Sequence, residues 1–293
     1  MARPSPVKSR HDQGIARRFL VDALRDRLAS RRRQRQQMRL DAAGDDRHPA
    51  ALIFGAGAQP GIGAAIASRA AQEGYRVYVT GRSRDKLDAT VAAMTAAGGQ
   101  AEALTVDVAH PEQIDAAFAA VAEAGCRLEL VVHNVGTNRP CAFLDLTPAW
   151  LEAAWVNDCR SGFLVGQHAI RAMLEQADLG NGRGTVLFTG ASASLRGKAH
   201  FAAFAQAKAG LRMLAQALAR EYGPQGIHVA HVIIDGLVDG ARLRRHLSEL
   251  VDAQGQDGAL EPAAIADAYW AVHTQQRSAW TQELDLRPYK EAW

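Results

Sequence analysis

Short apolar runs and longer helical segments alternate along the chain from about residue 50. The apolar runs lie at 51–54, 76–80, 103–106, 128–132, 184–188 and 228–234, and a last strand is expected near 279–286. Segments with helical spacing separate them, at 61–74, 84–97, 111–124, 147–178, 201–222 and 261–273. Strands that are apolar throughout are buried on both faces, which is typical of a parallel sheet covered by helices on each side. The pattern therefore predicts an α/β fold with a Rossmann-type doubly wound parallel sheet of about seven strands.

The first 48 residues do not follow this pattern. Ile15, Phe19, Leu20, Leu24 and Leu28 recur at helical spacing ahead of an arginine-rich run. Residues 1–47 contain 13 of the 34 Lys and Arg residues but only 6 of the 31 acidic ones, so the rest is mildly acidic. An amphipathic helix on a partner, an anionic surface or nucleic acid is one interpretation, and a solvated, partly helical extension is the simpler one. We expect an extension over 1–48, with nucleic acid an improbable partner, and one domain over 49–293, where no repeat or linker is found.

Composition narrows the class of protein further. Hydrophobic residues make up 48% of the chain and charged residues 22%, as in an ordinary globular enzyme. No run of 18 apolar residues and no signal peptide is found, so no association with a membrane is expected. The three cysteines have no CxxC spacing, which predicts a reducing compartment, taken as the cytoplasm, and no metal site.

The first predicted strand runs directly into a glycine-rich turn, "FGAGAQPGIG". Gly57, Gly61 and Gly63 have the spacing G-xxx-G-x-G, and Ile62 lies between the last two. Small residues let backbone amides approach a pyrophosphate at the start of the following helix, and the last glycine allows close packing of helix and strand. A dinucleotide site is therefore expected at this turn.

Further motifs follow in an order that resembles the short-chain dehydrogenase/reductase family over about residues 50–290. "VDV" places Asp107 and Val108 where the family contacts adenine, and "HNVG" keeps Asn134 and Gly136 of its Asn-Ala-Gly motif. Lys208 lies where the family has the lysine of Tyr-x-x-x-Lys. The resemblance implies a nicotinamide cofactor, with Lys208 holding the nicotinamide ribose.

The residues after the second strand bear on the type of cofactor. An acidic residue there would accept the ribose hydroxyls of NAD(H) and repel a 2′-phosphate. This chain has Gly81 at that position, followed by Arg82, with Ser83 and Arg84 as further candidates. A guanidinium grips phosphate through two parallel hydrogen bonds, so the sequence favours NADP(H) over NAD(H).

The resemblance also implies a reaction centre of serine, tyrosine, lysine and asparagine, and this chain departs from it. Ser192 is the first candidate for the serine, with Ser194 second. Phe204 occupies the tyrosine position, and its ring can neither donate nor accept a proton. The chain thus resembles a divergent subgroup of the family with Phe in place of the catalytic Tyr.

Three other positions carry alternatives that the sequence leaves open. Asp158 fits the asparagine position when counted back from "GFLVGQ", and Asn157 fits if one residue is inserted. Asp235 replaces the family's proline after the sixth strand, where it would lie by the nicotinamide or cap a turn. Arg242 lies in a predicted lid segment and would meet an anionic substrate or simply face solvent.

Two functions are predicted for the domain over 49–293, beside the binding of an anionic surface or nucleic acid considered for the arm. The first is an NADP(H)-dependent oxidoreductase acting on a carbonyl, hydroxyl or conjugated C=C of a small molecule, with a non-standard proton source. The second is a non-catalytic NADP(H)-binding protein, either a structural partner or a redox sensor. The resemblance also implies a homodimer or homotetramer, with helices near 157–178 and 201–222 pairing between subunits.

Overall fold

The computed structural model describes residues 45–57 and 59–291 of the chain. The chain divides into two units, Met1–Asp46 and Arg47–Trp293, and the account below concerns the second. The predicted helical spacing over 15–28, and the arm to which it belongs, lie outside the described residues.

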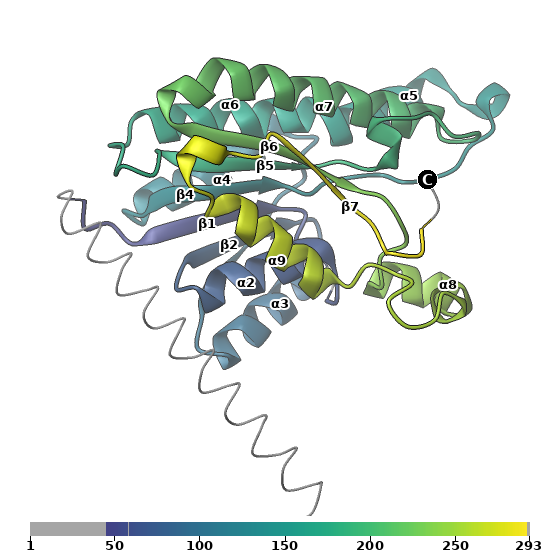
Figure 1. Cartoon of the computed structure of the whole chain (residues 1–293), viewed down its shortest axis with the longest axis horizontal. Helices are drawn as coiled ribbons and strands as arrows, with labels where there is room; N and C mark the ends of the chain where they lie inside the picture. The colour runs from purple at the N-terminus through teal and green to yellow at the C-terminus, as the bar shows by residue number, and fades with distance from the viewer. Residues whose placement is uncertain (1–44, 58, 292–293) are drawn as a thin grey trace, which may run out of the picture. The chain divides into compact units, whose positions relative to one another are not determined.

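A single sheet of seven strands forms the centre of the second unit. The strands are β1 (Pro49–Phe54), β2 (Arg76–Gly81), β3 (Gln100–Thr105), β4 (Arg127–His133), β5 (Gly184–Thr189), β6 (Ile227–Ile234) and β7 (Glu283–Leu286). They lie in the order β3-β2-β1-β4-β5-β6-β7, and every neighbouring pair is parallel. The predicted doubly wound parallel sheet is confirmed (Figure 1).

Helices cover both faces of this sheet. Figure 1 shows α2 (Ile62–Gln72), α3 (Arg84–Ala96) and α9 (Pro262–His273) on one face. The other face carries α4 (Pro111–Glu123), α5 (Pro148–Trp155), α6 (Ser161–Leu174) and α7 (Ala202–Tyr222), while α8 (Ala241–Ala253) stands apart from both layers.

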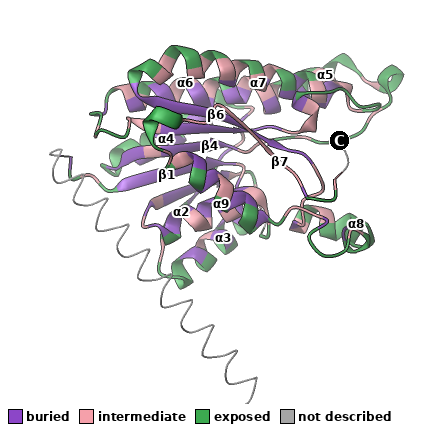
Figure 2. Cartoon of the chain, viewed as in Figure 1, coloured by how far each residue is buried: buried purple, intermediate pink, exposed green. Residues whose placement is uncertain are grey.

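The side chains of β1 point alternately into two hydrophobic cores, one on each face of the sheet. Ala51 and Ile53 pack with α2 and α9, whereas Leu52 and Phe54 pack with α4, α6 and α7. All four of these residues are fully buried, and β1 is buried along its whole length (Figure 2). A strand that is apolar at every position can be explained only by this double burial.

The structure differs from the expectations in two elements. The segment 147–178, predicted as one helix, is α5 and α6 joined by a π-helical turn, Val156–Arg160, and α6 ends at Leu174. The last strand is shorter than predicted, because Arg277–Ala279 forms a 3₁₀ turn before it.

The carboxyl ends of all strands meet at one edge of the sheet. The chain leaves β1 toward β2 and leaves β4 toward β5, so the connections diverge between the neighbours β1 and β4. At such a reversal, the crevice outside the carboxyl ends of the strands is where open α/β sheets bind ligands. The glycine turn after β1 and the "HNVG" segment after β4 lie on its two sides.

Candidate functional site

The glycine turn after β1 leaves the start of α2 free. Gly61 caps α2 without any side-chain hydrogen bond, and no acidic residue lies in the first turn of the helix. A Cβ at residue 57 would meet nothing within 4 Å, so this backbone faces open space. A Cβ at residue 63 would come within 2.4 Å of the Gly55 carbonyl oxygen. The turn therefore needs glycine at 63 for packing, and the start of α2, which has no side-chain cap at Gly61, suits an anion.

The end of β4 closes against this turn. The amide nitrogen of Asn134 donates to Phe54 O over 2.8 Å, and its side-chain nitrogen donates to Gly55 O over 3.0 Å. Gly136, two residues further, is exposed. The two hydrogen bonds of Asn134 thus connect the end of β4 to the turn after β1.

The ends of β2 and β3 supply the next polar groups along the edge. Arg82 is exposed and forms no ion pair or hydrogen bond with any described residue, whereas Arg84 is held by both carboxylate oxygens of Asp88. Asp107 is half-buried, and its Oδ1 accepts from Ala109 N over 3.0 Å. Val108 is buried in the core beneath it. These residues lie just after the carboxyl ends of β2 and β3.

Lys208 on α7 is the buried cation of the site. It is 3% exposed, and its Nζ donates to Val135 O and Thr189 O, each over 2.8 Å. Burial lowers the pKa of this ammonium group below its usual range. An ammonium has three donors, so one N–H remains for a ligand beside Gly136.

Phe204 lies one helical turn before Lys208. Its side chain is buried, and the ring centroid is 5.9 Å from Lys208 Nζ. The Phe204 ring gives the ammonium an aromatic neighbour but no proton donor.

Two serines follow β5, and the structure distinguishes them. Ser194 is buried, and its hydroxyl accepts from Ala191 N and contacts His231 Nε2 at 3.3 Å. Ser192 is half-buried, and no described residue forms a hydrogen bond with its hydroxyl. Ser192 is therefore the serine that is free to meet a ligand.

The π-helical turn decides between Asn157 and Asp158. Asn157 is turned outward, where its side chain donates to Ala153 O over 2.7 Å. Asp158 is fully buried, and its carboxylate accepts from the amide nitrogen and the hydroxyl of Thr137 at 2.9–3.0 Å. Burial raises the pKa of this carboxyl, while Lys208 and Thr137 oppose the rise. Asp158, not Asn157, reaches the site.

Asp235 is engaged in two ion pairs. It is buried and forms ion pairs with Arg196, in the loop after β5, and with Arg287, after β7. The carboxylate thus ties together two loops at the carboxyl edge.

A partly buried chain of polar groups leads away from Ser194 and was not expected from the sequence. His231 Nδ1 lies 3.1 Å from Glu283 Oε2, and Glu283 accepts from the Nε and Nη2 atoms of Arg212 over 2.6 and 2.7 Å. Burial lowers the pKa of His231 to about 4, so its ring is neutral near pH 7. We call this set, with Ser194, the Arg212–Ser194 chain.

Two absences hold for the part of the chain that the structure describes. No group of three or more His, Cys, Asp and Glu residues is placed to hold a metal ion. No helix there is both long enough and apolar enough to cross a membrane.

Comparison with known proteins identifies the class to which this fold and site belong. The model of the short chain dehydrogenase family matches residues 50–249. The chain therefore belongs to the short-chain dehydrogenase family, which is a family of oxidoreductases.

Particular relatives cover most of the chain. The short-chain reductase protein NovJ of Streptomyces niveus is 32% identical over 81% of this chain and 87% of its own. The crystal structure of a short-chain dehydrogenase from Rhodopseudomonas palustris is 39% identical, with a TM-score of 0.68 over 83% of this chain and 99% of that one. A metagenomic short-chain oxidoreductase in complex with NADP is 27% identical, with a TM-score of 0.69 over 83% and 98%.

Proposed function

We propose that the protein is an NADP(H)-dependent oxidoreductase that acts on a carbonyl, hydroxyl or conjugated C=C of a small molecule. The observation that carries this proposal is the pairing of an uncapped α2 terminus with a buried lysine across the same crevice. One feature suits a pyrophosphate and the other suits ribose hydroxyls. The NADP complex of the metagenomic relative and the reductase name of NovJ support the cofactor and the reaction type.

In this proposal, residues along the carboxyl edge hold the cofactor. The backbone of the turn that contains Gly57, Gly61, Ile62 and Gly63 would hold the pyrophosphate. Asp107 and Val108 would contact the adenine, and Arg82 would contact the 2′-phosphate. Asn134, Gly136 and Lys208 would surround the nicotinamide ribose, and the bound cofactor would supply or accept the hydride.

The chain's own groups complete the site in this proposal. The free Ser192 hydroxyl would donate to the substrate oxygen, where negative charge develops during reduction. Lys208 would fix the ribose through its third N–H. Phe204, in the position of the family's tyrosine, leaves the proton to another group.

Binding and turnover test the proposal together. Fluorescence titration of the purified full chain should give saturable binding of NADPH that is tighter than that of NADH. Absorbance at 340 nm should then follow oxidation of NADPH with members of a panel of ketones, diketones and enones. The absence of binding by either reduced cofactor would overturn the proposal.

Phe204 favours a second candidate, a non-catalytic NADP(H)-binding protein that serves as a structural partner or a redox sensor. Loss of a positioned general acid costs about 10²–10⁴ in rate. This candidate predicts the same NADPH binding with no turnover on any member of the panel.

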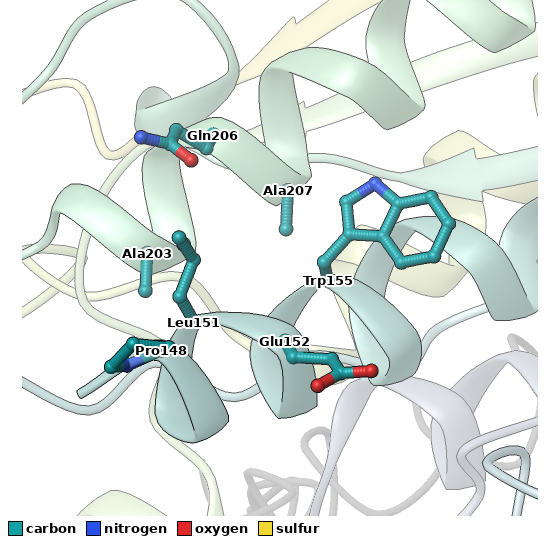
Figure 3. A pocket seen from close by; sticks show the side chains of 7 residues that line it. All are labelled: Pro148, Leu151, Glu152, Trp155, Ala203, Gln206 and Ala207. Atoms are coloured by element: carbon teal, nitrogen blue, oxygen red, sulfur yellow. The ribbon is translucent and has the colours of Figure 1, made fainter. Parts of the chain in front are cut away.

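We also propose that the chain forms a homodimer or homotetramer through the α5–α7 face. An apolar groove of about 290 Å³ lies between α5 and the start of α7 (Figure 3). It is lined by Pro148, Leu151, Glu152 and Trp155 on the side of α5 and by Ala203, Gln206 and Ala207 on the side of α7. Trp155, Phe163 and Met213 on α5, α6 and α7 are each about half exposed. Apolar side chains gathered on one helical layer are typical of an interface between subunits.

A further inference from the structure

The segment that carries α8 is anchored at its base to the glycine turn after β1. The amide nitrogen of Ala241, the first residue of α8, donates to Pro60 O over 2.7 Å. A Cβ at residue 240 would lie 3.2 Å from the same carbonyl oxygen, so the two backbones approach closely. The far end of the segment returns to its start, where Val238 and Leu260 form an isolated parallel bridge. Figure 1 shows α8 beyond the carboxyl ends of the strands, and its first turn therefore lies beside the turn that would hold the cofactor.

Two arginines at the start of α8 are held differently. Arg244 lies between two carboxylates, because it forms ion pairs with both Asp239 and Asp252. Arg242, next to the anchored Ala241, is exposed and forms no ion pair or hydrogen bond with any described residue. Arg244 thus holds the segment together, while Arg242 keeps its whole fork of N–H donors for a ligand.

The charge of Arg242 also acts on the segment that follows β4. Burial raises the pKa of the Asp158 carboxyl, and the positive charge of Arg242 is among the effects that oppose this rise. The carboxylate is already engaged by Thr137, whose amide nitrogen and hydroxyl both donate to it. Arg242 therefore lies within electrostatic reach of this side of the crevice without forming an ion pair there.

Other cations near this end of the crevice have their donors engaged. Lys208 gives two N–H groups to backbone carbonyls, and Arg196 pairs with the buried Asp235. A desolvated anion beside the reacting atoms needs a cation with free donors, and Arg242 is one that the described residues offer.

We propose that the substrate carries an anionic group, a carboxylate or a phosphate, and that Arg242 binds this group at the rim of the crevice. A guanidinium holds either group through two parallel hydrogen bonds, which also orient the rest of the molecule. The inference rests on the oxidoreductase function proposed above and names the class of substrate for that same site.

Binding to the NADP⁺ complex tests this inference without turnover, because the oxidised cofactor cannot reduce a ketone. The probes are aliphatic oxo acids of increasing chain length and their neutral methyl esters, titrated by calorimetry into the full chain saturated with NADP⁺. We expect an oxo acid of suitable length to bind about 10–100-fold more tightly than its ester. The same series with a phosphate in place of the carboxylate shows which of the two anions fits better.

Variants assign this preference to residue 242. Arg242→Ala should bring the anion and its ester to about equal affinity. Arg242→Lys should retain only part of the preference, because an ammonium group is a point charge without the planar fork. Arg245→Ala removes the same charge from an exposed position of the same helix and should preserve the preference. The affinity for NADP⁺ should change little in each variant, which also shows that each variant folds.

The outcomes separate this inference from the proposed function. If neither form of the cofactor binds, the oxidoreductase proposal fails and this inference fails with it. If NADP⁺ binds but no anion binds more tightly than its ester, or if Arg242→Ala leaves the preference intact, the anionic substrate is wrong while the cofactor site stands. If Arg242→Ala instead weakens the binding of NADP⁺ and leaves the preference unchanged, the guanidinium serves the cofactor's pyrophosphate, which also overturns the inference.

Discussion

Arg82 and Arg84 are two residues apart after β2, yet only one of them is free. Arg84 is held by Asp88, and Arg82 has no partner among the described residues. Arg82→Ala should weaken NADPH binding about 10–100-fold and leave NADH binding unchanged, since a hydrogen bond to a charged group contributes about 1.5–3 kcal/mol. Fluorescence titration with both cofactors measures the effect.

Arg84→Ala is the matched control for this prediction. Its guanidinium is engaged on α3, so its loss should change both affinities little. Equal loss of NADPH and NADH affinity in the Arg82 variant would mean that residue 82 does not read the 2′-phosphate.

Phe204→Tyr restores a phenol one turn before Lys208. Because a positioned general acid contributes about 10²–10⁴ in rate, we expect the rate of NADPH oxidation with a ketone to rise by up to that factor. Phe201→Tyr, at the start of the same helix, serves as the control for adding a hydroxyl. A rise from no measurable rate to clear turnover would favour the non-catalytic alternative instead.

At the scale of single residues, the sequence indicates which positions carry candidate site residues better than it indicates which residues they contact. Glycine spacing after the first strand predicts a dinucleotide loop locally, and the role of Lys208 is predicted from its motif. The choice between Asn157 and Asp158 depends on one extra residue in a helix, which local spacing cannot resolve. The ion pairs of Asp235 join residues 39 and 52 positions apart, so no sequence window contains both partners.

The Arg212–Ser194 chain joins α7, β7, β6 and the loop after β5. Glu283→Gln removes the anion between Arg212 and His231, and we expect a loss of about 1–3 kcal/mol in the free energy of unfolding near pH 7. Urea denaturation of both proteins measures this loss. The exposed pair of Arg76 and Glu102 is the comparison, where Glu102→Gln should cost no more than about 1 kcal/mol.

The ion pair of Arg212 and Glu283 also makes the free energy of unfolding depend on pH, with a definite sign. The hydrogen bond from Arg212 is the largest of the effects on Glu283, and it holds the pKa of that carboxyl below its ordinary value of 4.5. The stabilisation is therefore present above that value and is lost as the pH falls through the lowered pKa. The difference between wild type and Glu283→Gln should shrink in acid, and a difference that does not change with pH would contradict the assignment.

The elements themselves were largely predictable, since all seven strands appear near their expected places. Periodicity identifies them because both faces of the sheet are buried. It fails at 147–178, where α5, the π-helical turn and α6 share one continuous apolar pattern. A π-helical turn changes the hydrogen bonding of one stretch without changing residue types.

For the whole molecule, the α5–α7 face predicts the state of assembly. We expect light scattering after size exclusion to give a dimer or tetramer. Trp155→Asp should weaken association at least about tenfold, because a charge would be buried in an apolar contact. Phe143→Asp, at a highly exposed loop residue, should leave the mass unchanged. A wild-type monomer at every concentration would contradict the proposed interface.

The π-helical turn at Val156–Arg160 has a consequence for how this chain could have diverged. Each residue of an α-helix advances about 100° around the axis. Deleting one residue from the turn would let α5 and α6 run on as a regular helix, but would rotate one of them by that angle relative to the other. Either the Asp158 carboxyl or the Trp155 indole would then leave its present direction. The direction of the buried Asp158 carboxylate and that of the proposed contact face are consequently set by the same turn, and neither can change its register alone.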